Sequence, residues 1–497
     1  MTIQQYVLIS LFVSLLSACA VGPNYERPAV TVPEKFRSAP AEEISRKLPM
    51  DASIVDRPWW EIFDDPALKA LIDEALRNNY DVRVATWRVE EFRARAGIVR
   101  SQFFPQVQYQ GGWSRSRQSE FVQPGSSPVN LQDVNLGLSW EIDLWGRIRR
   151  LSEAGLAEYL STEEARRAVL LSVVSEVAQG YFELLEFDQR LAIARRTTDA
   201  FQGTYDLFSH QLEGGIASQL EVSRAEAALK AASASIPDLE RQIVAQENLI
   251  CLLLGRDPGP IPRGAILTEQ TLPPKVPPGL PSALLERRPD VGQAEELLVS
   301  ANAQVGAALA DFFPKIGLTG AFGGVSPGLS ELFQAGKAWS IAAGLAGPIF
   351  QGGRLKNQYH ANVAIFEEAK ARYESVVTRA FGEVSTALSS YQKLASAEVE
   401  QARSVAAYQD AVRLANIRYS GGLSSYVEVL DAEQQLFPAE NTLAATRLAR
   451  LEALVALYKS LGGGWSIEPQ RASARTLDTG NGRDTADESR LTKTQEP

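Results

Sequence analysis

The residue types that usually carry chemistry are scarce in this sequence. It contains two histidines, His210 and His360, and two cysteines, Cys19 and Cys251, which is too little material for a metal cluster or a disulfide framework. The stretch GVSPG at 324–328 has the spacing of a nucleophile elbow, but that motif needs a strand before it and a helix after it. Strands are expected on both sides here and no histidine motif accompanies the serine. We therefore predict a hairpin loop at 324–328 and no enzyme activity.

The charge balance excludes a further class of function. The formal net charge is −10 at pH 7, whereas binding to nucleic acid requires concentrated Lys and Arg to neutralise phosphates. We expect no nucleic-acid partner and, given the scarcity of ligating residues, no cofactor beyond a covalent lipid.

The N-terminus suggests export and lipid attachment. Residues 6–18, YVLISLFVSLLSA, form an apolar run that is short for a membrane span and fits a secretory signal. The quartet LSAC ending at Cys19 resembles a bacterial lipoprotein box, which implies that 1–18 is a signal peptide and that Cys19 carries acyl chains such as palmitate. Ala20 after the cysteine then favours the outer membrane. The alternative is an ordinary signal peptide with an incidental cysteine. Cys251 is expected to pack as an apolar residue.

The chain repeats itself over most of its length. GGIASQLEVSRAE at 214–226 matches GGLSSYVEVLDAE at 421–433, and the FFP at 103–105 matches the FFP at 312–314. This predicts two structural repeats, each with a helix, two strands and a long helical hairpin. The predicted segments are an acylated segment at 19–64, repeats at 65–270 and 282–466, a Pro-rich linker at 271–281, and a disordered tail at 467–497.

Each repeat contains two segments with strand periodicity. In DVNLGLSWEIDLW, residues 133–145, apolar and polar side chains alternate, and KIGLTGAFGG and AWSIAAGLAGPIF repeat the pattern more weakly. Their lengths suit tilted transmembrane strands, with aromatic residues at the strand ends as in an interfacial girdle. A soluble hairpin with half-buried strands would show the same alternation. Four strands cannot close a barrel: two chains would supply eight strands, whose interior is filled, and three would supply twelve, which leave a passage.

Long uninterrupted helices are expected beside the strands. No proline occurs from Arg149 to Gly214 or from Gln351 to Gly421, and helices of about 60 residues would be roughly 90 Å long. A coiled-coil spacing recurs position for position in the two repeats. Its members are Leu170, Val174, Val177, Tyr181 and Leu184 in the first, and Val377, Phe381, Val384, Leu388 and Tyr391 in the second. Pro237 and Pro438 lie in the returning helices, where kinks are expected.

Several ordered motifs together carry a family resemblance. They are RPWWEIFDDPALKALIDEALRNNYDV at 57–82, both FFP entries, DLWGRIRR at 143–150 and the two glycine-turn segments. Over residues 20–466 the chain resembles the outer membrane factor family of TolC- and OprM-like efflux channels, in its NodT-like lipoprotein branch. The resemblance implies an α+β membrane protein in which a homotrimer closes a twelve-stranded transmembrane barrel and a coiled-coil helical tunnel through the periplasm. It further implies a passive outer-membrane duct engaged by a periplasmic adaptor and an inner-membrane transporter.

The same resemblance assigns roles at the glycine turns. It places Glu428 and Asp431 in acidic rings that narrow the periplasmic end, where carboxylates one helical turn apart can face one lumen. It also places Tyr419 and Glu221 in a latch. Arg224 is a possible partner of Asp431, and Ser424 stands where TolC-like members have an arginine. Alternatively, these exposed carboxylates simply solvate the helix.

The turns themselves are the expected adaptor-docking tips. The candidate tip residues are Gly214, Gly215, Ser218, Gly421, Gly422 and Ser425. A competing interpretation is a lipid-anchored tether that spans the periplasm without a pore, although a tether has no use for alternating strands. The exported compounds are not encoded in any motif that we recognise.

Overall fold

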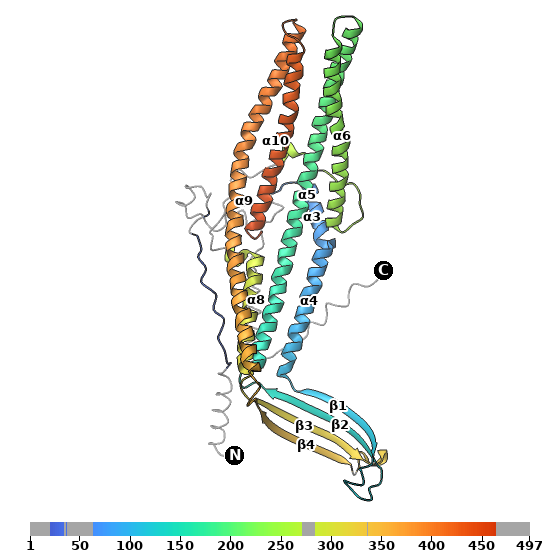
Figure 1. The fold of residues 1–497 in the computed structure, drawn as a ribbon, viewed down its shortest axis with the longest axis vertical. Coiled ribbons are helices and arrows are strands. Elements are labelled where there is room, and N and C mark those ends of the chain that lie inside the picture. The colour runs from blue at the N-terminus through green and yellow to red at the C-terminus, as the bar shows by residue number, and fades with distance from the viewer. Residues whose placement is uncertain (1–19, 34–35, 37–62, 271–283, 335, 464–497) are drawn as a thin grey trace.

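A computed structural model describes residues 20–33, 36, 63–270, 284–334 and 336–463. Cys19, residues 1–18, most of 37–64, the linker 271–281 and the tail 467–497 lie outside the described residues. The principal elements are α3 (Pro66–Asn78), α4 (Tyr80–Arg100), β1 (Gln106–Ser116), β2 (Val129–Ile142), α5 (Arg147–Glu213), α6 (Gln219–Leu254), α7 (Leu284–Arg287), α8 (Pro289–Ala310), β3 (Lys315–Ser326), β4 (Lys337–Ala346), α9 (Arg354–Ser420) and α10 (Val427–Ser460). The sheet lies at one end of an elongated molecule, and the two hairpins α5/α6 and α9/α10 reach the other end (Figure 1).

The four predicted strands form one antiparallel sheet in the order β1-β2-β3-β4. The loop prediction for 324–328 is only partly right, because β3 continues to Ser326 and Val325 still pairs with Asp133 of β2. The Ser326 hydroxyl is buried, donates to the Gly328 carbonyl at 2.7 Å and accepts from the Gly328 amide. The serine therefore closes a local turn and is not presented as a nucleophile.

The two long helices have equal length. α5 and α9 each contain 67 residues, which corresponds to roughly 100 Å. The predicted coiled-coil spacing is confirmed as a mostly buried stripe: Val177, Tyr181 and Val384 have no exposed surface, whereas Leu170 and Phe381 are partly buried. These side chains belong to one core that also includes α3, α6 and α10 residues.

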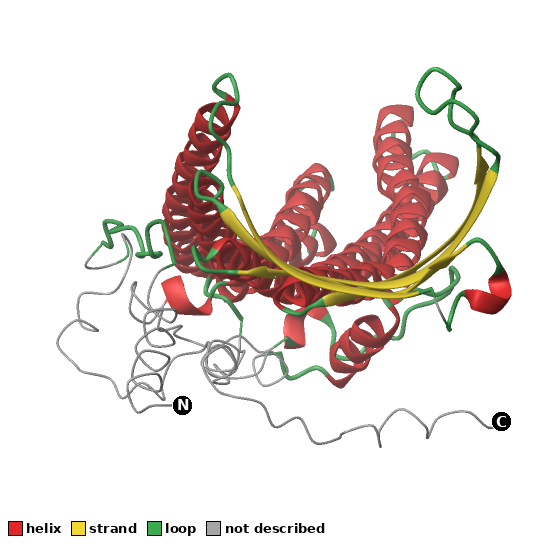
Figure 2. Ribbon diagram, turned by 90° about the horizontal axis from the view of Figure 1, so that it is seen from below, coloured by secondary structure: helices red, strands yellow, loops and turns green. Residues whose placement is uncertain are grey.

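The helices pack as a curved layer whose order changes along its length. Near the sheet, α5 packs between α4 and α8, and α8 packs in turn against α9. Near the tips, α5 packs between α6 and α10, and α10 packs against α9. At both heights the layer thus has the same two sides: α4 or α6 at one edge, and α9 at the other. Viewed from below, sheet and helices follow one open arc (Figure 2).

The C-terminal ends of α6 and α10 contact the N-terminal ends of α4 and α8, the helices that continue towards the sheet. Asn79 caps α4 by accepting from the amides of Asp81 and Val82, and its side-chain amide donates to the Leu253 carbonyl of α6 at 2.8 Å. We call this the first joint. At the second joint, Arg288 donates to the Ser460 carbonyl of α10 at 2.8 Å. The helix ends thereby satisfy carbonyls that would otherwise lack partners.

An extended N-terminal segment is fixed along this layer. The buried Arg150 side chain donates to the Gly22 carbonyl at 3.2 Å and to the Asn24 side chain at 2.8 Å. Further along, Arg27 makes a two-pronged ion pair with Glu295 of α8. The residues that follow Cys19 are therefore held to the helices close to the sheet.

Gly255 provides a test of the first joint. It has a φ of +68°, and a Cβ there would lie 2.5 Å from the Asn78 carbonyl oxygen. Gly255→Ala should lower the free energy of unfolding by roughly 1–3 kcal/mol, since it adds a strained backbone conformation to a clash with main chain. Gly259→Ala is the matched control, because nothing lies within 4 Å of its Cβ position. Denaturant unfolding in detergent checks both, and equal stability of the two variants would contradict the close approach.

Candidate functional site

The sheet has one apolar face that is nevertheless exposed. The strand register aligns Tyr109, Leu136, Phe322 and Trp339 in one row across all four strands. Tyr109 is 87% exposed and Trp339 is 74% exposed. Such a large exposed apolar surface requires a covering partner.

The opposite face of the sheet is polar or carries small residues. Gln108 of β1 aligns through Gly137 and Ala321 with Ser340 of β4. Sheets with an apolar outer face and a polar inner face are typical of transmembrane barrels, in which lipid contacts one face and water the other.

Aromatic residues lie where strands meet helices. Trp145 and Phe313 stack with their ring centroids 4.7 Å apart, and the Trp145 indole donates to the Pro314 carbonyl at 2.8 Å. Phe104 and Phe350, which the sequence also placed at strand ends, are 62% and 88% exposed. Amphipathic and aromatic side chains at this boundary suit a membrane interface.

Two edges of the molecule have no partner within the described chain. β1 pairs only with β2, and β4 only with β3. On the same side as β1, α4 exposes an apolar stripe consisting of Tyr80, Val84 and Trp87. Unpaired edge strands and an exposed stripe along one border indicate that the arc is incomplete.

The tip turns are built alike in the two hairpins. Gly215 and Gly422 have φ values of +74° and +69°, a conformation in which glycine has no steric cost. The Ile216 amide donates back to the Gln211 carbonyl, and Leu423 does the same to Arg418. All six predicted tip residues, Gly214, Gly215, Ser218, Gly421, Gly422 and Ser425, are exposed.

The matching glutamates of the two turns have different partners. Glu221 accepts from the Ser218 amide at 2.7 Å and from its hydroxyl at 2.9 Å, closing a capping box at the start of α6. These hydrogen bonds hold the pKa of the Glu221 carboxyl below its usual value. Glu428 instead lies 3.3 Å from the Arg418 guanidinium across the turn of the other hairpin.

Asp431 and Arg224 are both exposed. In the part of the chain that the structure describes, they form no ion pair with each other. Tyr419 likewise makes no hydrogen bond to Glu221 among the described residues: its hydroxyl accepts from the Gln211 side chain at 3.1 Å. The Ser424 hydroxyl is buried without a hydrogen-bond partner in the described structure.

The structure adds an aromatic cluster at the tip that sequence reasoning missed. Tyr426 is buried, and its hydroxyl hydrogen-bonds the Thr204 hydroxyl of α5. Its ring packs edge-on against Phe208 and Tyr419, with centroids 4.9 Å apart in each pair. Tyr426 thus joins the two hairpins directly. The only sequence signal was an aromatic residue where the first turn has Gln219.

A second missed residue is Glu433 on α10. One of its carboxylate oxygens is buried and has no hydrogen-bond partner in the described structure. Burial raises the pKa of Glu433 from 4.5 to about 7. Burial also raises the pKa of the Tyr426 hydroxyl to about 12, and the nearby Glu433 carboxylate adds to this effect.

Comparisons with known proteins agree on one family. The chain matches the sequence profile described as "Outer membrane efflux protein" over residues 71–256 and 280–463. The efflux pump outer membrane protein TtgC of Pseudomonas putida KT2440, which is described as probable, is 36% identical over 473 residues, covering 94% of this chain and 97% of TtgC. The cation efflux system protein CusC of Escherichia coli K12 is 34% identical over 455 residues, covering 90% of this chain and 97% of CusC.

A solved structure supports the same grouping. The open-state MtrE outer membrane channel of Neisseria gonorrhoeae aligns with a TM-score of 0.81 at 33% identity, covering 90% of this chain and 98% of MtrE. The similarity therefore extends over both sheet and helices.

The buried carboxyl predicts a pH dependence of tip stability. The folded state holds the Glu433 proton more tightly than the unfolded state, so stability is greatest below about pH 4.5 and falls as the pH rises through about 7. Glu433→Gln should remove this part of the pH dependence and increase amide protection of the tip at pH 8, while changing little at pH 4.5. Hydrogen exchange of peptides near 420–436 at the two pH values measures this amide protection. Glu226→Gln, at an exposed position of α6, is the control, and an equal response of the two variants would argue against burial.

Proposed function

The chain belongs to the outer membrane efflux protein family, and from this premise we propose that three copies close its duct across the outer membrane. Channels of this family are outer-membrane components of tripartite efflux systems, in which a periplasmic adaptor and an inner-membrane transporter complete the path. The observation that carries the proposal is the two-faced, open-edged sheet fused to two long helical hairpins.

The edges explain why several copies are needed. A sheet edge inside a bilayer leaves backbone groups without hydrogen-bond partners, so β1 of one copy must pair with β4 of another. The same association would bring α4 of one copy to α9 of the next, covering the apolar stripe of Tyr80, Val84 and Trp87. Three copies supply twelve strands, whereas two supply eight, which leave an interior filled by side chains.

The polar face of the sheet would then line the passage. Its opposite, apolar face would contact lipid, and the aromatic side chains at the sheet–helix boundary would lie near the lipid headgroups. Ala20 packs against Gly146 at that boundary. Acyl chains on Cys19, one peptide bond away, would therefore begin close to the membrane surface. A periplasmic tether would need neither face.

The gate is proposed at the glycine-turn end. With three copies, Glu428 and Asp431 would form rings of three carboxylates each, which favour cations in a narrow passage. Tyr419 would contribute to the latch through Gln211, its partner within the chain. Glu221 is already engaged at its own helix, which makes its contribution structural in this conformation. The exposed tip residues would dock the adaptor.

The cargo is not specified by these features. TtgC is described as part of an efflux pump and CusC as part of a cation efflux system, although both resemble this chain to a similar degree. A passive duct of this form would take its substrates from the pump that it serves.

Native mass spectrometry of the detergent-solubilised protein tests the assembly. We expect a mass near three times the 54.3 kDa chain, apart from processing and lipid. Trp87→Asp should shift the particle towards monomer, because it places a charge in the stripe that the neighbouring copy covers. A single-chain mass for the unaltered protein would overturn the proposal.

Ion selectivity tests the acidic rings. Glu428→Gln combined with Asp431→Asn should reduce the preference for cations over anions several-fold in planar bilayers, because the focused negative field is lost. Glu374→Gln, an exposed change near the other end of α9, is the control, since its charge is separated from the tip by far more than the Debye length of about 8 Å. Unchanged selectivity in the double variant would place the constriction elsewhere.

A further inference from the structure

The two joints differ in chemistry although they occupy matching positions. Asn79 at the first joint makes neutral hydrogen bonds, to α6 and to its own helix. Arg288 at the second joint is only 6% exposed and also binds two carboxylates. Its guanidinium contacts both oxygens of Asp290, at 3.0 and 2.7 Å, and one oxygen of Glu383 at 2.7 Å. The second joint is thus tied to the flank of the long helix α9 by an ion pair.

The ion pair between Glu383 and Arg288 holds the second hairpin to the start of α8. Arg288 precedes α8, receives the end of α10 through Ser460, and reaches α9 through Glu383. The equivalent position on α5 is Glu176, which is exposed and forms no ion pair within the described residues. The first hairpin is held near its joint by ion pairs of Arg256 with Glu74 and of Arg263 with Asp188 and Glu247. In the second hairpin the residue at the joint is itself charged and pairs directly with the long helix.

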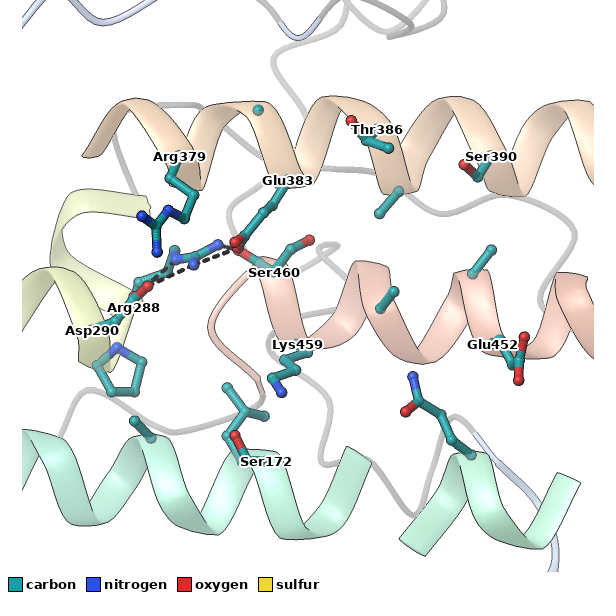
Figure 3. A pocket seen from close by; sticks show the side chains of 18 of the residues that line it. Ser172, Arg288, Asp290, Arg379, Glu383, Thr386, Ser390, Glu452, Lys459 and Ser460 are labelled. Carbon is teal, nitrogen blue, oxygen red and sulfur yellow. Dashed lines mark hydrogen bonds and ion pairs between the residues drawn. The ribbon is translucent and has the colours of Figure 1, made fainter. Parts of the chain in front are cut away.

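A second cation lies within reach of the same carboxylate. Arg379 stands four residues before Glu383 on α9, a spacing that allows side chains to pair on one helix face. Both residues line a cavity of about 1090 Å³ between α5, α9 and α10. Figure 3 shows Arg379 and Glu383 projecting from α9 towards the end of this cavity where Arg288 and Asp290 lie. Among the described residues, Arg379 forms no ion pair or hydrogen bond.

We propose that Glu383 is a switch residue, which pairs with Arg288 while the second hairpin is held in place and with Arg379 when this hairpin tilts to widen the tip. This inference rests on the proposed duct function. It assigns Glu383 and Arg379 as positioning residues that act on the gate from a distance, through the orientation of α9.

The exchange has a low barrier for a physical reason. When Glu383 leaves, Arg288 keeps both oxygens of Asp290 and the Ser460 carbonyl, so no buried charge is left without a partner. The Glu383 side chain is 45% exposed, so its carboxylate can stay in contact with water while it changes partners. The cavity provides room for the movement and for water.

The part of α9 beyond Glu383 is long, so a small tilt at the joint produces a large displacement at the tip. From Glu383 to the end of α9 at Ser420, the helix rises about 55 Å at about 1.5 Å per residue. A tilt of about 5° at the joint would therefore move the tip by about 5 Å. A change of one ion pair at mid-height can in this way alter the width of a ring formed by Glu428 and Asp431.

Distances between the tips of the full-length protein in lipid nanodiscs test the switch. A spin label on Ser425→Cys reports them, because Cys251 is fully buried and the proposed acyl chains block Cys19. Glu383→Gln removes the pairs of both states, but the pair with the nearly buried Arg288 outweighs the exposed helical pair with Arg379, so the wide-tip population should rise roughly twofold. Arg379→Gln removes only the pair of the wide state and should lower this population by a similar factor. The double variant should behave like Glu383→Gln alone, because Arg379 acts only through Glu383.

Matched variants separate the switch from general destabilisation. Glu176→Gln, at the equivalent position of the first hairpin, should leave the distances unchanged, and Arg379→Lys should retain the distribution of the unaltered protein. An Arg379→Gln variant with unaltered distances, or additive effects in the double variant, would overturn the switch. Conductance recorded on the same samples is a separate readout: no conductance from either the unaltered protein or a variant with widened tips would refute the duct, while the tip distances would still decide the switch.

Discussion

The unpaired edges of the sheet are the constraint on which the rest of the structure depends. Within the described residues, β1 and β4 each have one hydrogen-bonded neighbour, and a bilayer offers no water to satisfy the other side. The register therefore has to serve two purposes at once. It aligns apolar side chains on one face, as in the row from Tyr109 to Trp339, and it leaves two edges that only another copy can fill. The helices follow the same open arc as the sheet (Figure 2). α4 and α9 lie at its two borders, since α4 packs against α5, and α9 packs against α8 and α10.

The two halves share a framework but differ in the chemistry placed on it. The turn glycines, the equal lengths of α5 and α9 and the two joints recur at corresponding positions. At the turns, Glu221 caps its own helix whereas Glu428 faces Arg418. At the joints, an amide in one half corresponds to a guanidinium in the other. At both places the second hairpin uses an ion pair where the first uses a capping hydrogen bond or a neutral amide.

The sequence predicted what depends on local periodicity. Strict alternation identified β2 and its apolar side, the coiled-coil spacing identified the buried stripe around Tyr181 and Val384, and the paired glycines identified the turns. Contacts between distant segments were not predictable in this way. The bond between Tyr426 and Thr204 spans 222 positions, and it depends on the rotation of one hairpin against the other. The partner of Tyr419, Gln211, was not foreseen for the same reason, and the end of β3 at Ser326 reflects pairing with β2 that no local pattern records. The Ser218 partner of Glu221 is different, because the two residues form a local capping box that sequence reasoning missed.

The second hairpin is held at three heights by contacts of different kinds. At the tip, Tyr426 packs against Phe208 and bonds Thr204; midway, Arg196 of α5 pairs with Glu440 of α10; at the joint, Arg288 binds Glu383. The first contact buries aromatic surface and resists water, whereas the other two include partly exposed charges that water and alternative partners can replace. A movement that begins at the joint would therefore meet its main resistance at the aromatic cluster. Glu433 lies on α10 near that cluster, and one of its carboxylate oxygens is buried without a hydrogen-bond partner in the described structure. The cost of ionising this group therefore falls on the same part of the second hairpin.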